Sequence, residues 1–131
     1  MSSAKLNNEK NKIFFNSRKK FFDKINSLSR FEVALGELRF INGIYKQKGI
    51  DVLMSWDIVD KCFGKQIAHA ILVAGDADFI PAIKRAKGYG AIVHLFAHKE
   101  SVNRTILCEV DEFYELNEEF FRDCKLDKYQ F

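Results

Sequence analysis

The sequence predicts an α/β fold in which helices lie on the faces of a mostly parallel sheet. Two short apolar runs, AHAILVAG (residues 68–75) and AIVHLFA (91–97), are typical of strands buried on both faces of such a sheet. Residues 80–87 between them have helical spacing, with Pro81 in the first turn, where a missing N–H costs little. Strand, helix and strand in this order indicate a right-handed crossover between parallel strands.

The segment upstream of these strands predicts a helix, a strand and a loop. Residues 11–28 place apolar side chains at helical spacing and predict an amphipathic helix. The sequence FEVALGELRF (31–40) is rich in residues that suit a strand, and Gly36 indicates a bulge or bend within it. The polar segment INGIYKQKG (41–49) is interpreted as the loop that follows.

A second helix is predicted over residues 50–63, ending before Gly64. Its apolar positions recur at steps of three and four residues and predict one buried face: Val52, Trp56, Val59 and Phe63. The same reasoning assigns four aromatic residues to core packing before base stacking: Trp56, Phe63, Phe79 and Phe96. From residue 101 onward the pattern predicts a helix, a short FYEL strand and a final helix.

Length and composition predict one folded domain over residues 1–131. The N-terminus lacks the apolar run of a secretory signal, and no apolar segment reaches the roughly 18 residues of a membrane span, so a cytoplasmic protein without membrane contact is expected. Three cysteines without CxxC spacing argue against a disulfide framework, and we expect them to be reduced and mostly buried. The motifs of nucleotide-triphosphate, dinucleotide and serine-esterase sites are absent from the sequence.

The net charge of +3 conceals an asymmetry along the chain. Residues 1–108 carry 18 Lys and Arg against 10 Asp and Glu, whereas residues 109–131 carry 3 against 8. A basic body is compatible with a polyanionic partner, because Lys and Arg that neutralise phosphates release counterions. Ordinary solvated surface charge explains the same count.

Two aspartates follow the predicted strand 68–75 directly. Asp76 and Asp78 stand at its carboxyl end, where open parallel sheets bind their ligands. Two carboxylates this close repel each other unless a cation neutralises them, and Mg²⁺ or Mn²⁺ takes oxygen ligands. The alternative is structural: Asp78 caps the next helix and Asp76 is solvated.

Asp51 follows the Lys48-Gly49 turn at the start of the second helix. It serves either as an N-terminal cap or, if that helix begins at the sheet edge where GDADF lies, as a third carboxylate of a site for phosphodiester hydrolysis. Asp57 lies six positions further, roughly 240° around the helix. Asp57 is therefore a secondary metal-ligand candidate, with a polar surface role as the alternative.

The motifs KG-x-D, SWD and GD-x-DF-x-P, with a Gly before the last apolar strand, resemble the NYN domain of the bacterial LabA-like group. They lie in KGIDVLMSWDIVDKCFGKQIAHAILVAGDADFIPAIKRAKGYGAIVHLF. Upstream FFDKINSLSRFEVALGEL, and downstream Ser101 and DEFYEL, resemble the flanks of that block. The resemblance covers about residues 20–116 and leaves an acidic extension over 117–131.

The resemblance implies a PIN-like, Rossmann-like fold with three αβα layers and cleavage of RNA that depends on Mg²⁺ or Mn²⁺. It implies catalytic, metal-binding roles for Asp51, Asp76 and Asp78, with the ion activating a water and stabilising phosphate charge. Residues that hold the RNA backbone would then come from a polar set: Lys46, Lys48, Ser101 and Arg104.

One feature of the family is not found in this sequence. Members begin with an apolar strand that ends in Asp, and nothing before residue 12 is apolar enough to match it. The expected sheet is therefore N-terminally incomplete, with unpaired edges flanking FEVALGEL or AILVAG. Self-pairing in a homodimer or a strand from a partner would complete it.

Two other functions are compatible with these residues. The first is a catalytically impaired NYN module that binds RNA or a protein partner, and the number of converging carboxylates separates it from a nuclease. The second is a DxD metal site of the Toprim type or of a sugar-nucleotide transferase. The Toprim reading needs a Glu followed by glycine on an earlier strand, a context that Glu32 and Glu37 lack.

Overall fold

Helix α1 (Ser2–Asn26) opens the chain and, with the residues up to Gly36, forms one of two units in this computed structural model, which describes residues 2–125. The predicted helix over residues 11–28 is thus confirmed as an element, although it begins earlier, at Ser2, and ends at Asn26. Residues 31–36 are not a strand, so the strand predicted over 31–40 is shorter than expected. The expectation of a single domain stays a prediction. Within the described residues, no helix is long and apolar enough to cross a membrane.

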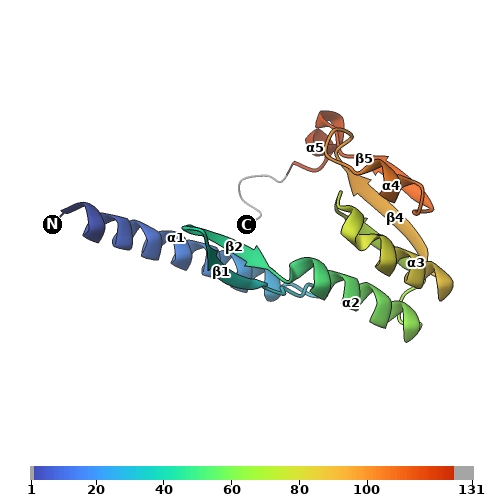
Figure 1. The fold of residues 1–131 in the computed structure, drawn as a ribbon, viewed down its shortest axis with the longest axis horizontal. Helices are drawn as coiled ribbons and strands as arrows, with labels where there is room; N and C mark the ends of the chain where they lie inside the picture. Colours follow the sequence, from blue (N-terminus) through green and yellow to red (C-terminus); the bar gives the residue numbers. More distant parts are fainter. Residues whose placement is uncertain (1, 126–131) are drawn as a thin grey trace. The chain divides into compact units, whose positions relative to one another are not determined.

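The second unit contains the sheet (Figure 1). Its elements are β1 (Glu37–Ile41), β2 (Ile44–Lys48), α2 (Ile50–Phe63), β3 (His69–Val73), the 3-10 turn η1 (Ala77–Phe79), α3 (Ile80–Gly88), β4 (Ile92–Ala97), α4 (Arg104–Leu107), β5 (Glu112–Glu115) and α5 (Glu118–Asp123). Strands β3, β4 and β5 form a parallel sheet in that order. The α/β fold with a parallel sheet flanked by helices is confirmed and is consistent with a PIN-like fold.

The segment predicted as a loop over residues 41–49 is a strand of a hairpin. Strand β2 pairs antiparallel with β1, and Ile41 lies opposite Ile44. The two residues between them, Asn42 and Gly43, have φ angles of 52° and 79°. Asn-Gly favours this left-handed two-residue turn, so β1 finds its partner locally rather than in the parallel sheet.

One face of the parallel sheet carries the hydrophobic core. Leu95 of β4 and Ile83 of α3 are both fully buried, and Ile106 of α4 joins them. Cys62 brings α2 into the same cluster. Because alternate residues of a strand face opposite sides of a sheet, α2, α3 and α4 all cover the same face. On the opposite face, Phe120 of α5 contacts the half-buried Phe96 of β4, with ring centroids 5.9 Å apart.

Helix α2 has apolar residues on two sides, and the buried side is not the predicted one. Met54, Ile58 and Cys62 recur every four residues and pack on the core. Three of the four residues of the predicted stripe face solvent, with Trp56 68% and Val52 60% exposed and Phe63 exposed as well, whereas Val59 is half-buried. The core role predicted for this stripe is therefore wrong, because periodicity alone does not say which of two apolar sides meets the sheet.

The remaining aromatic and cysteine predictions divide in the same way. Phe79 is buried as predicted, whereas Phe63 is exposed and meets only the edge of the Tyr89 ring among the ring contacts of the described residues. Cys62 is buried, but Cys108 and Cys124 are exposed, so the expectation of mostly buried cysteines is wrong for two of three. The three thiols are free, as expected.

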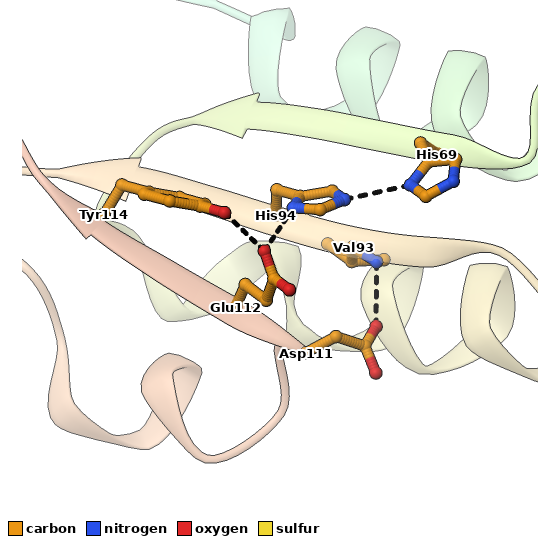
Figure 2. Close-up of polar contacts among 6 residues, drawn as sticks. All are labelled: His69, Val93, His94, Asp111, Glu112 and Tyr114. Atoms are coloured by element: carbon orange, nitrogen blue, oxygen red, sulfur yellow. Dashed lines mark hydrogen bonds and ion pairs between the residues drawn. The ribbon is translucent and has the colours of Figure 1, made fainter.

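A polar ladder crosses the opposite face of the sheet (Figure 2). His69 Nδ1 lies 3.0 Å from His94 Nε2, and His94 Nδ1 lies 3.0 Å from the carboxylate of Glu112. The Tyr114 hydroxyl donates to that carboxylate, which lowers the pKa of Glu112 and raises the pKa of Tyr114. His94 and Glu112 are register partners on β4 and β5, whereas the contact from His69 of β3 to His94 is diagonal, because the register partner of His94 on β3 is Ile71.

Strand β3 is an edge strand within residues 2–125, because β4 is its one partner there. Its side chains Ile71 and Val73, on the face opposite the core, are exposed, so the expectation of a strand buried on both faces is wrong for β3. An open edge at AILVAG was expected for an N-terminally incomplete sheet. The predicted helix, strand and helix of the tail are also confirmed, as α4, β5 and α5, while residues 126–131 of the acidic extension lie outside the described residues.

We expect the stability of the sheet to depend on pH through Asp111. The Val93 N–H donates to its carboxylate at 2.8 Å, and this bond, helped by the charge of Lys87, holds the pKa of Asp111 below its ordinary 3.8. A carboxylate whose pKa is lower in the folded state than in the unfolded state contributes its full stabilisation at pH values above its unfolded pKa. That stabilisation is lost as the pH falls through its folded pKa. We expect Asp111→Asn to lower the melting temperature at pH 7, by an amount that shrinks below about pH 4.

The matched control is Glu115→Gln, which neutralises an exposed carboxylate on β5, the strand that follows Asp111. Thermal unfolding of both variants and the wild type at neutral and acid pH measures the effect. An equal loss for Asp111→Asn at both pH values would contradict the assignment to its charge.

Candidate metal centre

Three carboxylates from two separate segments meet in the second unit. One oxygen from each of Asp51, Asp76 and Asp78 lies within 4.8 Å of the other two. Asp51 stands in the first turn of α2, and the other two follow the carboxyl end of β3. All three side chains are exposed. The convergence predicted from the order of strands and helices is therefore present in the structure.

Gly49 explains how Asp51 reaches this position. The residue caps the N-terminus of α2 with a φ of 87°, a left-handed conformation that glycine adopts without a steric penalty. Its carbonyl accepts the Leu53 N–H at 3.0 Å, which begins the helix immediately after β2. The carboxylate of Asp51 consequently lies in the first turn, where the helix dipole favours negative charge.

Asp76 and Asp78 are held by a tight turn. The Asp78 N–H donates to Asp76 Oδ1 at 3.0 Å, so Asp76 caps η1. The alternative to a metal site predicted that Asp78 caps a helix and that Asp76 is solvated. In the structure Asp76, and not Asp78, is the capping residue. Because the cap uses one oxygen of Asp76, the second oxygen takes no part in that bond and remains a possible ligand.

Gly75 keeps this turn against the loop that follows β4. A Cβ at Gly75 would lie 3.1 Å from the Ser101 carbonyl oxygen and 3.3 Å from Val102 Cα, both backbone atoms. The Asn103 N–H donates to the Gly75 carbonyl at 2.9 Å. Any larger residue must therefore displace either the loop or the turn that carries Asp76.

We expect Gly75→Ala to weaken Mn²⁺ binding by about tenfold while the chain stays folded, since displaced outer-shell positions typically cost 10- to 100-fold in metal affinity. Mn²⁺ titration and thermal unfolding of the same samples measure the two effects. Gly88→Ala is the matched control, because a Cβ there meets nothing within 4 Å. Unchanged Mn²⁺ affinity in Gly75→Ala would refute the proposed constraint.

The donor set fits a hard divalent cation. Oxygens that share one Mg²⁺ lie about 2.9 Å apart when adjacent and about 4.2 Å when opposite, given bonds of 2.0–2.1 Å. The observed limit of 4.8 Å is close to that span, and exposed Asp side chains have rotamer freedom to close the difference. Carboxylate oxygens are also the ligands that Mg²⁺ and Mn²⁺ prefer over thiolates or imidazoles. The residues present therefore fit the ion.

The sequence around these carboxylates matches a known protein family. The family model described as NYN domain matches residues 5–117. The chain belongs to the NYN domain family. This is a family of nuclease type whose members generally use a divalent metal and whose domains are generally related to RNA. The resemblance noted in KG-x-D and GD-x-DF-x-P is thereby confirmed.

This NYN chain is similar in sequence to one curated protein and in fold to one solved structure. It is 38% identical over 58 residues to the uncharacterized protein y4oD of Sinorhizobium fredii, a stretch that covers 44% of this chain and 27% of that protein. A crystal structure of a protein of unknown function from Vibrio parahaemolyticus is similar at a TM-score of 0.64 and 23% identity, over 79% of this chain and 63% of that one. The chain thus spans about a quarter of the curated relative. The structural likeness supports the fold.

The other predicted site residues of the NYN domain lie outside the carboxylate group. Asp57 is exposed on α2 and does not join it. Lys46 and Lys48 are exposed on β2, and Arg104 is exposed at the start of α4. Ser101 contributes backbone beside Gly75, while its hydroxyl donates to the His98 carbonyl at 3.2 Å. Their roles toward metal or RNA stay predictions.

A groove beside the carboxylates was not predicted. It lies between α2 and α3, has a volume of about 640 Å³ and includes Asp51 and Asp78 in its wall. Trp56 and Arg85 also line it. Both residues are exposed and were assigned either to the core or to no role. The signal in the sequence was the apolar stripe of α2 that contains Val52, Trp56 and Val59 and begins next to Asp51.

Proposed function

We propose that this NYN domain is a ribonuclease that hydrolyses phosphodiester bonds of RNA with Mg²⁺ or Mn²⁺. The observation that carries the proposal is the convergence of Asp51, Asp76 and Asp78, whose oxygens come within 4.8 Å of one another. Membership of a nuclease-type family supports it. Three carboxylates that lie this close repel one another, and a divalent cation relieves that repulsion.

Each residue has a defined part in this proposal. Asp51, Asp76 and Asp78 hold the ion, and Asp76 is oriented for this by its cap bond to the Asp78 N–H. When bound, such an ion supplies a more acidic water and neutralises charge on the phosphate. In hydrolysis the water oxygen bonds to phosphorus and loses a proton, the bond from phosphorus to one ribose oxygen breaks, and that oxygen leaves as a hydroxyl after it takes up a proton. Lys46 and Lys48 on β2 are proposed to bind the RNA backbone.

The test is cleavage of a labelled single-stranded RNA by the purified chain, with Mn²⁺ and with excess EDTA. We expect cleavage that requires the metal and leaves fragments that carry a phosphate at the new end. Equal cleavage in EDTA would indicate a contaminating metal-independent nuclease. Absence of cleavage by a folded chain that binds Mn²⁺ would refute the proposed activity.

A second candidate is a binding module that does not cleave. The observation that favours it is the open edge of β3 within residues 2–125, with Ile71 exposed at 69% beside it. Such an edge accepts a strand from a second copy or a partner. Light scattering measures the oligomeric state, and a monomer that cleaves RNA would remove the need for this candidate.

A further inference from the structure

The groove between α2 and α3 has two walls of different origin. One wall is an apolar stripe of α2, in which Val52, Trp56 and Val59 recur at steps of four and three residues, and Asp51 lies beside it in the first turn. The other wall comes from η1 and the first turns of α3, and its members are Ala77, Asp78, Pro81, Ala82 and Arg85. The groove is therefore mostly apolar, with carboxylates at one end and a guanidinium in its lining.

The position of Trp56 in this groove is unusual for a tryptophan. Trp56 is 68% exposed, whereas on its other side the same helix packs the partly buried Met54 and Ile58 and the buried Cys62 on the core. Tryptophan is highly buried on average, so a large exposed ring that lines a groove indicates a ligand-binding surface. A flat indole offers a π-face on which any unpaired base can stack.

The carboxylates fix what kind of ligand would lie there. Asp51 and Asp78 belong both to the groove and to the metal group. Trp56 lies five residues after Asp51, about 7.5 Å along the helix axis and roughly 140° around it, and both residues line the same groove. A strand whose phosphate lies at the carboxylates would thus carry the adjacent base to the indole. Arg85 supplies positive charge for a neighbouring phosphate or the base.

We infer that this groove is the subsite for an unpaired nucleobase next to the scissile phosphate, with Trp56 as its stacking platform and Arg85 as its cation. The inference rests on the proposed ribonuclease function and deepens it. A paired base cannot leave its stack to enter the groove without an energetic cost, so the site selects single-stranded over double-stranded RNA. Stacking reads no base edges, and the selection is tolerant of sequence.

The protein's one tryptophan reports on its own site. Binding is measured in the Asp76→Asn, Asp78→Asn background, which leaves RNA intact and removes two negative charges. We expect a short oligouridylate to quench the Trp56 fluorescence, and a ribose-phosphate strand of equal length without bases to leave it unchanged. In the same background, Trp56→Ala should weaken binding of labelled oligouridylate by about tenfold, and Trp56→Phe by less.

Phe63→Ala is the matched control, because Phe63 is an equally exposed aromatic residue of α2 outside the groove. Melting temperatures show that each variant is folded. Equal binding of the strand without bases, or unchanged binding by a folded Trp56→Ala, would overturn the subsite.

Failure of the subsite is distinguishable from failure of the nuclease. Metal-dependent cleavage by the wild type without base-dependent binding refutes the subsite alone. Base-dependent quenching without any cleavage in Mn²⁺ refutes the ribonuclease and leaves a single-strand binding site. Trp56→Ala in the otherwise wild-type chain should raise KM more than it lowers kcat, because base stacking contributes to binding of the substrate and the transition state alike.

Discussion

Replacement of Asp76 and Asp78 by Asn is expected to lower Mn²⁺-dependent RNA cleavage by about 10³-fold. Both carboxylates lie within 4.8 Å of the Asp51 oxygen, and their loss removes two of three anionic ligands. Stabilisation of phosphate charge by a bound ion contributes several kcal/mol, and each 1.36 kcal/mol is a factor of ten in rate. Asn preserves the size of each side chain, and its amide oxygen can still accept the Asp78 N–H in the cap.

The matched control for this variant is Asp60→Asn, which removes an exposed carboxylate of α2 outside the group. Initial cleavage rates of a labelled single-stranded RNA over a range of Mn²⁺ concentrations give the comparison. We expect the control to retain the wild-type rate. Cleavage by the double variant at the same rate as the wild type would mean that the active carboxylates lie elsewhere.

Leu95→Ala is expected to lower the free energy of unfolding by about 3 kcal/mol, the middle of the range for buried Leu→Ala changes. Leu95 is fully buried at the centre of β4, the middle strand of the parallel sheet. Truncation leaves a cavity between β4 and the helices that cover this face. Against a total stability of 5–15 kcal/mol, this is a large fraction.

Ile71→Ala provides the matched control, because Ile71 is an apolar residue of the adjacent strand that points to the face opposite the core and is 69% exposed. Urea unfolding of both variants measures the two free energies. We expect a change of less than about 0.5 kcal/mol for the control. A similar loss for both variants would show that the face of β3 opposite the core is also covered in solution.

Sequence patterns predicted the part of the fold in which one physical signal dominates. The apolar runs of β3 and β4 and the helix of α3 between them lie where expected, because continuous hydrophobicity and Pro81 each permit few structures. The hairpin of β1 and β2 was missed although Asn-Gly is a hairpin-turn sequence, because the polar residues KQK at the end of β2 do not have the apolar pattern of a strand. Local pairing decided that segment, and hydrophobic pattern did not reveal it.

The carboxylates of the candidate site could be predicted, because they follow from chain order. Residues that follow β3 and residues at the start of α2, the helix before β3, are both expected at the edge of the sheet where β3 ends, so they are expected to lie close together. The groove could not be predicted in the same way. Trp56 and Met54 lie on different sides of one apolar helix, and tertiary packing alone determines which side is covered. Arg85 acquires its position only through the packing of α3 beside α2.

The most direct test of the metal centre is a titration of Mn²⁺ against the wild type and the Asp76→Asn, Asp78→Asn variant, with the free ion followed by electron paramagnetic resonance. We expect one bound ion per wild-type chain, displaced by Mg²⁺, and no binding at the same concentrations by the folded variant. Failure of a folded wild type to bind Mn²⁺, or equal binding by the variant, would contradict the assignment of a metal site to Asp51, Asp76 and Asp78.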